Sequence, residues 1–350
     1  MVARCLGAVP LILDWQVHEA AWLTAERLAE MPDTVVFHAR KKMLDNLVAG
    51  RFGLLRALAA HAVGQGWQIV GMPFKAATQD IALSNPRHLH VFLDDRPVYA
   101  RNALHVVPSY LHGFWFADEV GSRNNSSMRM ESFDPALVDA GQAQGFFAYL
   151  CKRFIDKNRS KFEQEPRGSV PLQPGALAFF AQDFRPPKHH LHFLTVPQMI
   201  EASIAAKGER RLYIKPHPNQ GFDEHEALAA YHRPDLGVEI SHASIHDLLA
   251  ASDCALALTS AVGFEASLHK TPVVLAGQTD FWHNAVTLTD TKCMPQALAA
   301  AMSRDWPYEK FLFWYLKTRC FEDNEGALPG VLAKLHRKGF AFADPGCGYF

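Results

Sequence analysis

One stretch in the second half of the sequence holds a histidine in a form suited to binding an anion. An apolar run ends at Lys215-Pro-His-Pro218, so His217 stands between two prolines. Proline fixes φ and pushes the residue before it toward extended geometry, which leaves His217 few orientations. A restrained imidazole suits a phosphate ligand. A proline-rich turn whose histidine only bonds its own loop is the alternative.

A carboxylate and a pair of hydroxyls also follow apolar runs. Asp183 comes just after residues 176–181, and open α/β sheets bind ligands beyond the carboxyl ends of their strands, where a reacting carboxylate is useful. Thr259 and Ser260 open a helical stretch, 261–269. Hydroxyls and free N–H groups at a helix start can bind phosphate, although a plain helix cap is the alternative for Ser260.

The first half contains one polar loop that follows an aromatic segment. Residues 113–129 run from aromatic side chains into glycine, asparagine and serine. Within this loop Glu119 is a candidate general base toward a hydroxyl, and the planar forks of Arg123 and Arg129 are candidates for binding a carboxylate. The alternative is a solvated turn with an ion pair.

Buried strands must position these residues, and apolar runs alternate with helical spacing along most of the chain. In the first half the predicted strands are 9–13, 34–38, 67–73, 88–93 and 103–107, and the predicted helices are 20–31, 54–64 and 146–162. In the second half the predicted strands are 176–181, 211–215, 237–240, 254–258 and 270–277, and the predicted helices are 195–207, 244–252 and 261–269. Apolar strands separated by helices predict parallel sheets covered on both faces.

The predicted fold class is α/β with two Rossmann-like domains. A chain of 350 residues exceeds the usual size of a single core, and its clearest break is the stretch 163–175, rich in proline and glycine. We therefore predict an N-terminal domain over 1–165, a C-terminal domain over 166–325, and a tail over 326–350 that packs back on the first domain.

Composition excludes several classes of protein. With 35 basic and 36 acidic residues the chain has no electrostatic footprint for nucleic acid. The six cysteines form no CxxC pair, which fits a reducing cytoplasm, and no acidic or cysteine ligand is spaced to complete a metal site with His189, His190 and His192. The aromatic stretch 305–319 suits a membrane surface or, preferably, the protein's own core.

Four motifs together resemble a known family. They are Asp118-Glu-Val-Gly121 with the serine-rich stretch after it, Gln182-Asp183, Lys215-Pro-His-Pro218 and Thr259-Ser-Ala-Val-Gly-Phe-Glu265. Their order resembles the CMP-Kdo-using β-Kdo transferases of capsule and lipopolysaccharide assembly, a branch of the GT-B glycosyltransferases that also resembles bacterial sialyltransferases. The loop here reads Asp-Glu-Val-Gly-Ser-Arg, where the capsule enzymes carry a Glu-Asp-Gly-type loop.

The resemblance implies two Rossmann-like domains facing a central cleft, with acceptor bound by the first and CMP-sugar by the second. It implies transfer of Kdo from CMP-Kdo to a glycan with retention, without a metal or other cofactor. Asp183 would be the nucleophile, and Glu119 would bind or deprotonate the acceptor. The donor phosphate would be held by Lys215, His217, Thr259 and Ser260, with Gly263 and Glu265 beside them. The sugar carboxylate would be bound by Arg123, Arg129 or Arg185.

Other functions stay open at this point. The same histidine and hydroxyl pair suits another CMP- or CDP-activated transferase, either sialyltransferase-like or CDP-glycerol phosphotransferase-like. A non-catalytic GT-B scaffold that binds glycan is the third alternative. The expected partners are a CMP-sugar and a glycan or glycolipid acceptor, in the cytoplasm. Peripheral contact with the inner membrane or with other polysaccharide-assembly proteins is a further option.

Overall fold

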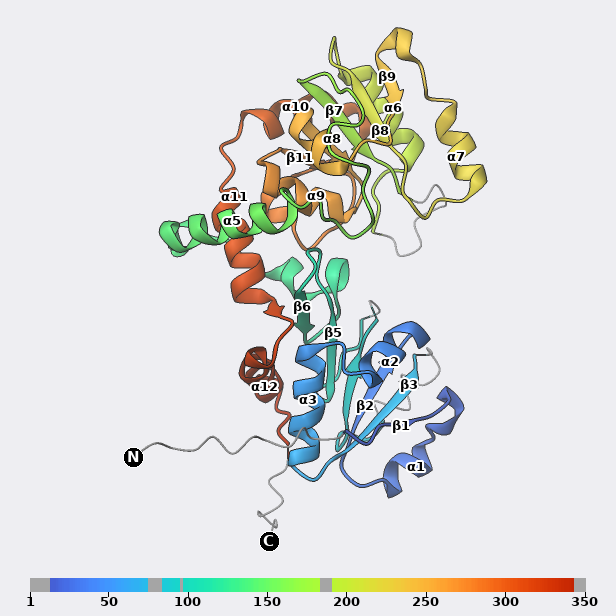
Figure 1. Cartoon of the computed structure of the whole chain (residues 1–350), viewed down its shortest axis with the longest axis vertical. Helices are drawn as coiled ribbons and strands as arrows, with labels where there is room; N and C mark the ends of the chain where they lie inside the picture. The colour runs from blue at the N-terminus through green and yellow to red at the C-terminus, as the bar shows by residue number, and fades with distance from the viewer. Residues whose placement is uncertain (1–12, 75–83, 95–96, 183–190, 343–350) are drawn as a thin grey trace. The chain divides into compact units, whose positions relative to one another are not determined.

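The structure, a computed structural model, describes residues 13–74, 84–94, 97–182 and 191–342 (Figure 1). The chain forms two compact units. Unit 1 comprises Met1–Pro108, Gly113–Ser127 and Cys320–Phe350, and unit 2 comprises Ser109–His112 and Met128–Arg319. Each unit has its own sheet, so the predicted α/β class with two Rossmann-like parts is confirmed. The cleft between them stays a prediction.

The limits of the units differ from the predicted domain limits at 165 and 325. Residues 128–165 fall in unit 2, where helix α5 (Ala140–Phe154) packs against helix α11 (Tyr308–Phe313). The proline- and glycine-rich stretch 163–175 is therefore internal to unit 2. Strand β13 (Phe321–Glu322) pairs with β6 (Phe114–Asp118) in unit 1. Helix α12 (Leu328–Arg337) adds Val331 and Leu335 to the same unit's core.

The sheet of unit 1 has seven strands in the order β1-β3-β2-β4-β5-β6-β13. The strands from β1 to β5 are parallel, and β6 and β13 are antiparallel to their neighbours. Helices α2, α3 and α12 cover one face, and residues of α1 pack on the other. The remaining bounds are β1 Gln16–Val17, α1 Ala25–Glu30, β2 Thr34–Ala39, α2 Lys41–Val48, α3 Gly53–Gly64, β3 Gln68–Pro73, β4 Leu89–Phe92 and β5 Ala103–Pro108.

The sheet of unit 2 has six strands, all paired in parallel, in the order β12-β11-β10-β7-β8-β9. Helices α6, α7 and α10 pack on one face, and α8 and α9 on the other. The strand bounds are β7 Ala176–Phe180, β8 Leu212–Lys215, β9 Val238–Ile240, β10 Ser252–Ala257, β11 Val273–Leu275 and β12 Val286–Thr287. The helix bounds are α6 Val196–Ala206, α7 Phe222–Ala229, α8 Ile245–Ala251, α9 Ala261–Glu265 and α10 Met294–Ser303.

The strand order of unit 2 reverses between β7 and β10. The chain runs from β7 outward to β8 and β9, and then returns to place β10 on the other side of β7. In open α/β sheets the crevice outside the carboxyl ends of two such strands is where ligands bind. The carboxyl ends of β7 and β10 lead directly into Gln182 and Thr259, two of the residues singled out in the sequence.

Several predicted helices differ in length from those in the structure. The helix predicted over 146–162 begins earlier, at Ala140, because Asp139 accepts a hydrogen bond from the Gln142 N–H at 2.7 Å, and it ends at Phe154. The helix predicted over 261–269 is α9 followed by a 3₁₀ turn, Ala266–His269. The helix predicted over 20–31 divides into a 3₁₀ turn, Ala20–Trp22, and α1. The strand predicted over 9–13 lies almost wholly outside the described residues.

The aromatic stretch 305–319 packs inside unit 2. Phe311, Trp314 and Tyr315 of α11 and the following π-helical turn are buried. The hydroxyls of Tyr110 and Tyr315 each donate to the buried carboxylate of Asp280, both at 2.6 Å.

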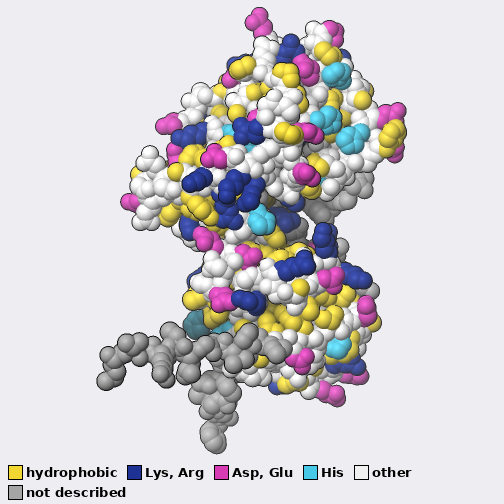
Figure 2. Space-filling model, in the orientation of Figure 1, with side chains coloured by type: hydrophobic (Ala, Val, Ile, Leu, Met, Phe, Trp, Pro, Cys, Tyr) yellow, Lys and Arg dark blue, Asp and Glu magenta, His cyan; other side chains and the backbone are white. Residues whose placement is uncertain are grey.

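Lys and Arg side chains gather on the visible face over α5 and α11 (Figure 2). In the described chain no single helix suffices in length and apolarity to cross a membrane, and only the bent pair of α2 and α3 passes that test.

Unit 1 buries a pair of histidines between its strands. His38 on β2 and His90 on β4 are fully buried, with His38 Nε2 at 3.0 Å from His90 Nδ1. Burial lowers the pKa of His38 to about 3. Burial, with neighbouring His38 and His88, holds the pKa of His90 well below its usual value. Both rings are therefore neutral in the folded protein at neutral pH.

We expect unit 1 to lose stability in acid because of this pair. The folded pKa values lie below the unfolded value of about 6.5, so protons bind the unfolded chain first. The contribution of the pair to the free energy of unfolding is fully present above about pH 6.5. Below that pH it falls by about 1.4 kcal/mol per pH unit for each histidine, until the pH reaches the folded pKa. Urea unfolding between pH 7 and 5 measures this loss. His38→Leu should make the slope shallower, whereas His225→Leu, at an exposed position on α7, should not; equal slopes would contradict the expectation.

Candidate functional site

The carboxyl ends of β7 and β10 are joined by one side chain. Gln182 accepts a hydrogen bond from the Thr259 N–H at 2.8 Å through its Oε1 atom, and its Nε2 atom donates to Thr259 Oγ1 at 3.4 Å. A single amide thus bonds both the backbone and the side chain of Thr259. The two strands flank the reversal in strand order, so this bond fixes the geometry of the crevice itself.

The imidazole of His192 reaches the same threonine from a third segment. Its Nε2 atom lies 3.0 Å from Thr259 Oγ1. The segment is held in place by a bridge between His192 and Gly277, by Phe193 N–H donating to Ala276 O at 2.9 Å and by Gln278 N–H donating to Leu191 O at 2.6 Å. A Cβ atom on Gly277 would lie only 2.5 Å from Thr259 Cγ2, so glycine is what permits this approach.

The His217 loop is attached to this joint by a second glutamine. Gln220 donates through Nε2 to the carbonyl oxygen of Gln182 and accepts from the His217 N–H at 3.0 Å. Residues Gln182, His192, His217, Gln220 and Thr259 therefore form one hydrogen-bonded set, which we name the carboxyl-edge network. It connects the ends of β8, β7 and β10, which are neighbours in the sheet.

The bonding of His217 fixes which ring nitrogen can face a ligand. Its Nδ1 atom accepts from the Asn219 N–H at 3.1 Å, so the neutral ring carries its proton on Nε2. Burial, and then the positive charge of Lys161, lower the pKa of His217. The ring is thus a neutral donor at neutral pH, with the Phe162 ring edge-on to it at 5.3 Å between centroids.

Ser260 is the N-cap of α9, and Gly263 and Glu265 lie within this helix, directly after the network. Ser260 Oγ accepts from the Val262 N–H at 3.3 Å and so caps the helix. A Cβ atom on Gly263 would lie 3.0 Å from Leu275 Cδ2 and 3.2 Å from Phe281, which shows that this glycine lets the helix pack closely on its neighbours. Because α9 has only five residues, we ascribe no phosphate affinity to its dipole.

Glu265 is buried and largely uncharged at neutral pH. Burial raises the pKa of its carboxyl to about 8, opposed by a hydrogen bond from Ser160 and by the charge of Lys161. Ser160 Oγ donates to Oε1 at 3.1 Å. The Oε2 atom is buried and has no hydrogen-bond partner among the described residues.

The ammonium of Lys215 is bonded to the backbone. It donates to Ala243 O at 2.7 Å and to His242 O at 3.3 Å, in the segment that leads into α8. Burial lowers its pKa. In this structure the side chain therefore holds the turn before α8, and its predicted contact with a donor phosphate stays a prediction.

In unit 1, Asp118 organises the polar loop that was singled out in the sequence. Its carboxylate accepts from the N–H groups of Val120, Gly121 and Ser127 and from Ser127 Oγ, at 2.7 to 3.1 Å. A Cβ atom on Gly121 would lie 2.5 Å from Asn125 O, so the tight loop requires glycine. The loop is thus held from the end of β6.

Glu119 turns toward helix α12. Its carboxylate oxygens lie 3.8 Å from Lys334 Nζ and 4.0 Å from Arg337 Nη2. Lys338 Nζ donates to Glu119 O at 2.9 Å. The ion-pair alternative of the sequence analysis therefore describes this residue in the structure, and its role toward an acceptor stays a prediction.

The predicted arginines are divided between the units. Arg123 in unit 1 donates to Pro108 O at 3.4 Å and has a positive φ of 51°. Arg129 belongs to unit 2, where its carbonyl accepts from Trp282 Nε1 at 3.2 Å. Asp183 and Arg185, and with them His189 and His190, lie outside the described residues. Within the described residues no group of three or more His, Cys, Asp or Glu is arranged to hold a metal ion.

Sequence reasoning assigned no role to three residues that build the network or the loop. Gln220 and Gly277 follow strand ends, and Asp118 ends the aromatic run of β6. A search for every amide, glycine and carboxylate within a few residues of a predicted strand end would have included them. His192 was considered only as a metal ligand, and the structure shows it bonded to Thr259 instead.

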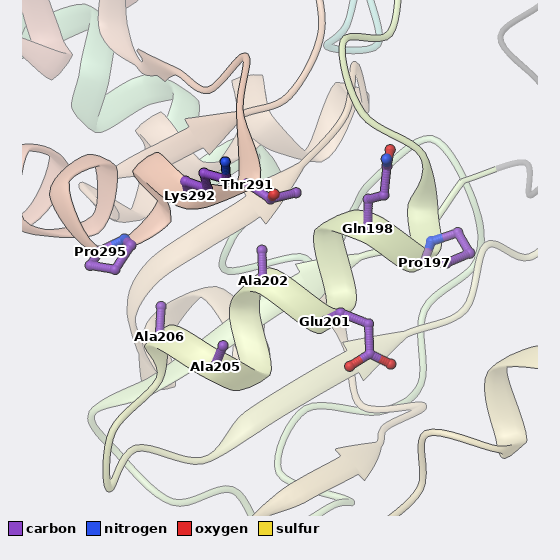
Figure 3. Close-up of a pocket in the computed structure, with 9 residues that line it drawn as sticks. All are labelled: Pro197, Gln198, Glu201, Ala202, Ala205, Ala206, Thr291, Lys292 and Pro295. Carbon is purple, nitrogen blue, oxygen red and sulfur yellow. The ribbon is translucent and has the colours of Figure 1, made fainter.

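A separate groove lies between α6 and the start of α10 (Figure 3). It holds about 530 Å³ and is lined mainly by small side chains, among them Ala202, Ala205 and Pro295, with Lys292 and Glu201 beside them. None of its lining residues belongs to the carboxyl-edge network, so we do not assign the chemistry to it.

We expect Gly277→Ala to disturb the network and destabilise unit 2. The new methyl group would meet Thr259 and two backbone carbonyl oxygens at 3.2 Å or less, and such overpacking costs about 1–3 kcal/mol. Gly145→Ala is the matched control, because its methyl group meets nothing within 4 Å on an exposed helix position and should stabilise by about 0.5–1 kcal/mol. Urea unfolding distinguishes the two, and equal effects would contradict the close approach.

Comparisons with known proteins place this fold beside several solved structures. No protein-family model and no curated protein matches the chain. Two similar structures are the β-Kdo 2,4 and 2,7 transferases of Thermosulfurimonas dismutans KpsC. The first is 15% identical, with 81% of this chain and 90% of that chain covered at a TM-score of 0.48. The second is 13% identical, with 80% and 89% covered at 0.48.

A third similar structure is Anabaena HepE in complex with UDP-glucose, 12% identical, with 87% of this chain and 78% of that chain covered at a TM-score of 0.41. Identities this low do not transfer an activity, so donor, acceptor and mechanism must be argued from the residues of this chain.

Proposed function

We propose that the chain is a glycosyltransferase that moves Kdo from CMP-Kdo to a glycan acceptor with retention. The observation that carries the proposal is the carboxyl-edge network. Its hydrogen bonds link residues of three of the four motifs, Gln182, His217 and Thr259, where the strand order of unit 2 reverses. Ligand sites of open α/β sheets lie at this position. The resemblance of the motifs supplies the identity of the donor.

The polar groups at this edge suit a monophosphate leaving group. His217 Nε2 is a neutral donor beyond the end of β8, and the hydroxyls of Thr259 and Ser260 lie beyond the end of β10, with β7 between the two strands. Donors fixed before the reaction stabilise negative charge as it develops, without reorganisation. A CMP phosphate held in this way does not require a divalent cation.

Retention follows from two successive displacements at the anomeric carbon, with one protein carboxylate as the nucleophile of the first and the leaving group of the second. Asp183 attacks the anomeric carbon of Kdo and CMP leaves, which gives a covalent glycosyl-enzyme. The acceptor hydroxyl then loses its proton, attacks the same carbon from the opposite face and releases Asp183. Gln182, the residue before Asp183 in the sequence, is itself fixed by the hydrogen bonds of its side chain and its carbonyl.

The other predicted roles complete the proposal. Glu119 binds or deprotonates the acceptor, which requires its carboxylate to exchange Lys334 for the acceptor hydroxyl. Arg123, Arg129 or Arg185 pairs with the Kdo carboxylate. Glu265 contributes its unpartnered oxygen to the donor ribose, or only packs.

We expect His217→Ala to weaken binding of CMP. A lost hydrogen bond to a charged group corresponds to about 1.5–3 kcal/mol, or at least about tenfold in affinity. Isothermal titration calorimetry of CMP against both proteins measures the change. His225→Ala, an exposed histidine of the same unit, is the control and should bind as the wild type does. Absence of CMP binding by the wild type would overturn the assignment of the donor.

Asp183→Ala tests the covalent step. The wild type mixed with CMP-Kdo should release CMP and gain the mass of one Kdo at Asp183, whereas the variant should lose transfer by about a thousandfold or more while it still binds CMP. Asp235→Ala, at an exposed site in unit 2, should keep both properties. Phosphodiester products would favour a CDP-glycerol type of transferase, and full activity of Asp183→Ala would exclude this nucleophile. Glycan binding without any turnover would favour a scaffold.

A further inference from the structure

The segment 158–168 is fastened at both ends to the start of helix α8. At one end Asn158 Oδ1 accepts from Ser244 Oγ at 2.6 Å, and the carbonyl oxygen of Arg159 lies 2.9 Å from His246 Nε2. At the other end Gly168 N–H donates to Asp247 at 2.8 Å, and Arg167 forms an ion pair with the same carboxylate. These bonds fix the path of the segment across unit 2.

The middle of this segment meets two of the candidate donor residues. Ser160 Oγ donates to Glu265 Oε1 at 3.1 Å, and the ring of Phe162 lies edge-on to the ring of His217 at 5.3 Å. Lys161 stands between these two residues in the chain, and its Nζ atom lies 5.5 Å from the centre of the Phe162 ring. An exposed ammonium is therefore held beside both the His217 loop and the end of α9.

Apart from Lys161, the carboxyl-edge network and the candidate donor residues beside it present mainly neutral donors. The His217 ring is neutral, the hydroxyls of Thr259 and Ser260 carry no charge, and the ammonium of Lys215 is bonded to backbone carbonyls. A phosphate that leaves with two negative charges is bound more strongly when a cation lies beside such donors. The flexible stem of a lysine lets its ammonium follow the charge as the bond breaks.

We propose that Lys161 binds the phosphate of the nucleoside monophosphate and so completes the donor site from the segment 158–168. This inference rests on the proposed function of the same site. The closeness of Lys161 to both residues supports it, because its positive charge helps to lower the pKa of His217 and opposes the rise that burial causes in the pKa of Glu265. The prolines and glycines of 163–175 predicted a break between domains there, and the sequence patterns indicated no functional role for residues 158–162.

Lys161→Met removes the charge and keeps most of the stem. Calorimetric titration with CMP and with cytidine separates phosphate binding from nucleoside binding. We expect the variant to bind CMP about tenfold or more weakly and cytidine unchanged. The affinity of the variant for CMP should also depend less on salt. Lys161→Arg should restore most of the CMP affinity, since a guanidinium also binds phosphate.

Lys157→Met is the matched control, because Lys157 is exposed, lies four residues earlier and has no role in the site. It should bind both ligands as the wild type does. If the wild type binds CMP and Lys161→Met binds it equally well, the role of Lys161 is wrong and the proposed function stands. An equal loss of CMP and cytidine would show a structural effect and overturn the inference. A wild type that binds neither ligand would overturn the proposed donor as well.

Discussion

The bond between Gln182 and Thr259 is the constraint on which the candidate site depends. The strand order of unit 2 reverses between β7 and β10, so helical crossovers leave the two strand ends without a connecting segment. Gln182 fills this point with two hydrogen bonds to one residue, and Gln220 and His192 attach the neighbouring loops to the same pair. The positions of the loops after β7, β8 and β10 therefore depend on one another, and the sequence of one loop alone does not determine them.

This edge is built almost entirely from neutral polar groups. Glutamine, threonine and neutral histidine satisfy one another and can be buried without the large desolvation cost of a charge. Unit 1 follows the same rule. Its buried histidines are neutral, and among its described residues only Asp118 has a buried carboxylate, which accepts four hydrogen bonds. In the proposed site the positive charge that binds the phosphate comes from an exposed segment, 158–168, which carries Lys161.

The pattern of apolar runs predicted most strands within one or two residues, since a strand buried on both faces has a continuous apolar sequence. Helix ends were predicted less well. The helix expected over 146–162 starts at Ala140 because of one side-chain cap from Asp139. The short helices α2 and α7 were not predicted, because few of their residues are buried, only Leu44 and Leu47 in α2 and Leu228 in α7. The limits of the units depend on contacts between residues distant in sequence, such as those of α5 with α11.

The sequence by itself determined the α/β class, the two sheets and the strand ends after which His217, Thr259 and Ser260 lie, because local apolar patterns and prolines act over a few residues. Only the tertiary structure decided which of these groups touch. Gln182 meets Thr259 across a separation of 77 residues, and Glu119 pairs with Lys334 of a helix near the end of the chain. A hydrogen bond between distant segments depends on how the strands are ordered in the sheet, and that order is set by packing of the whole unit.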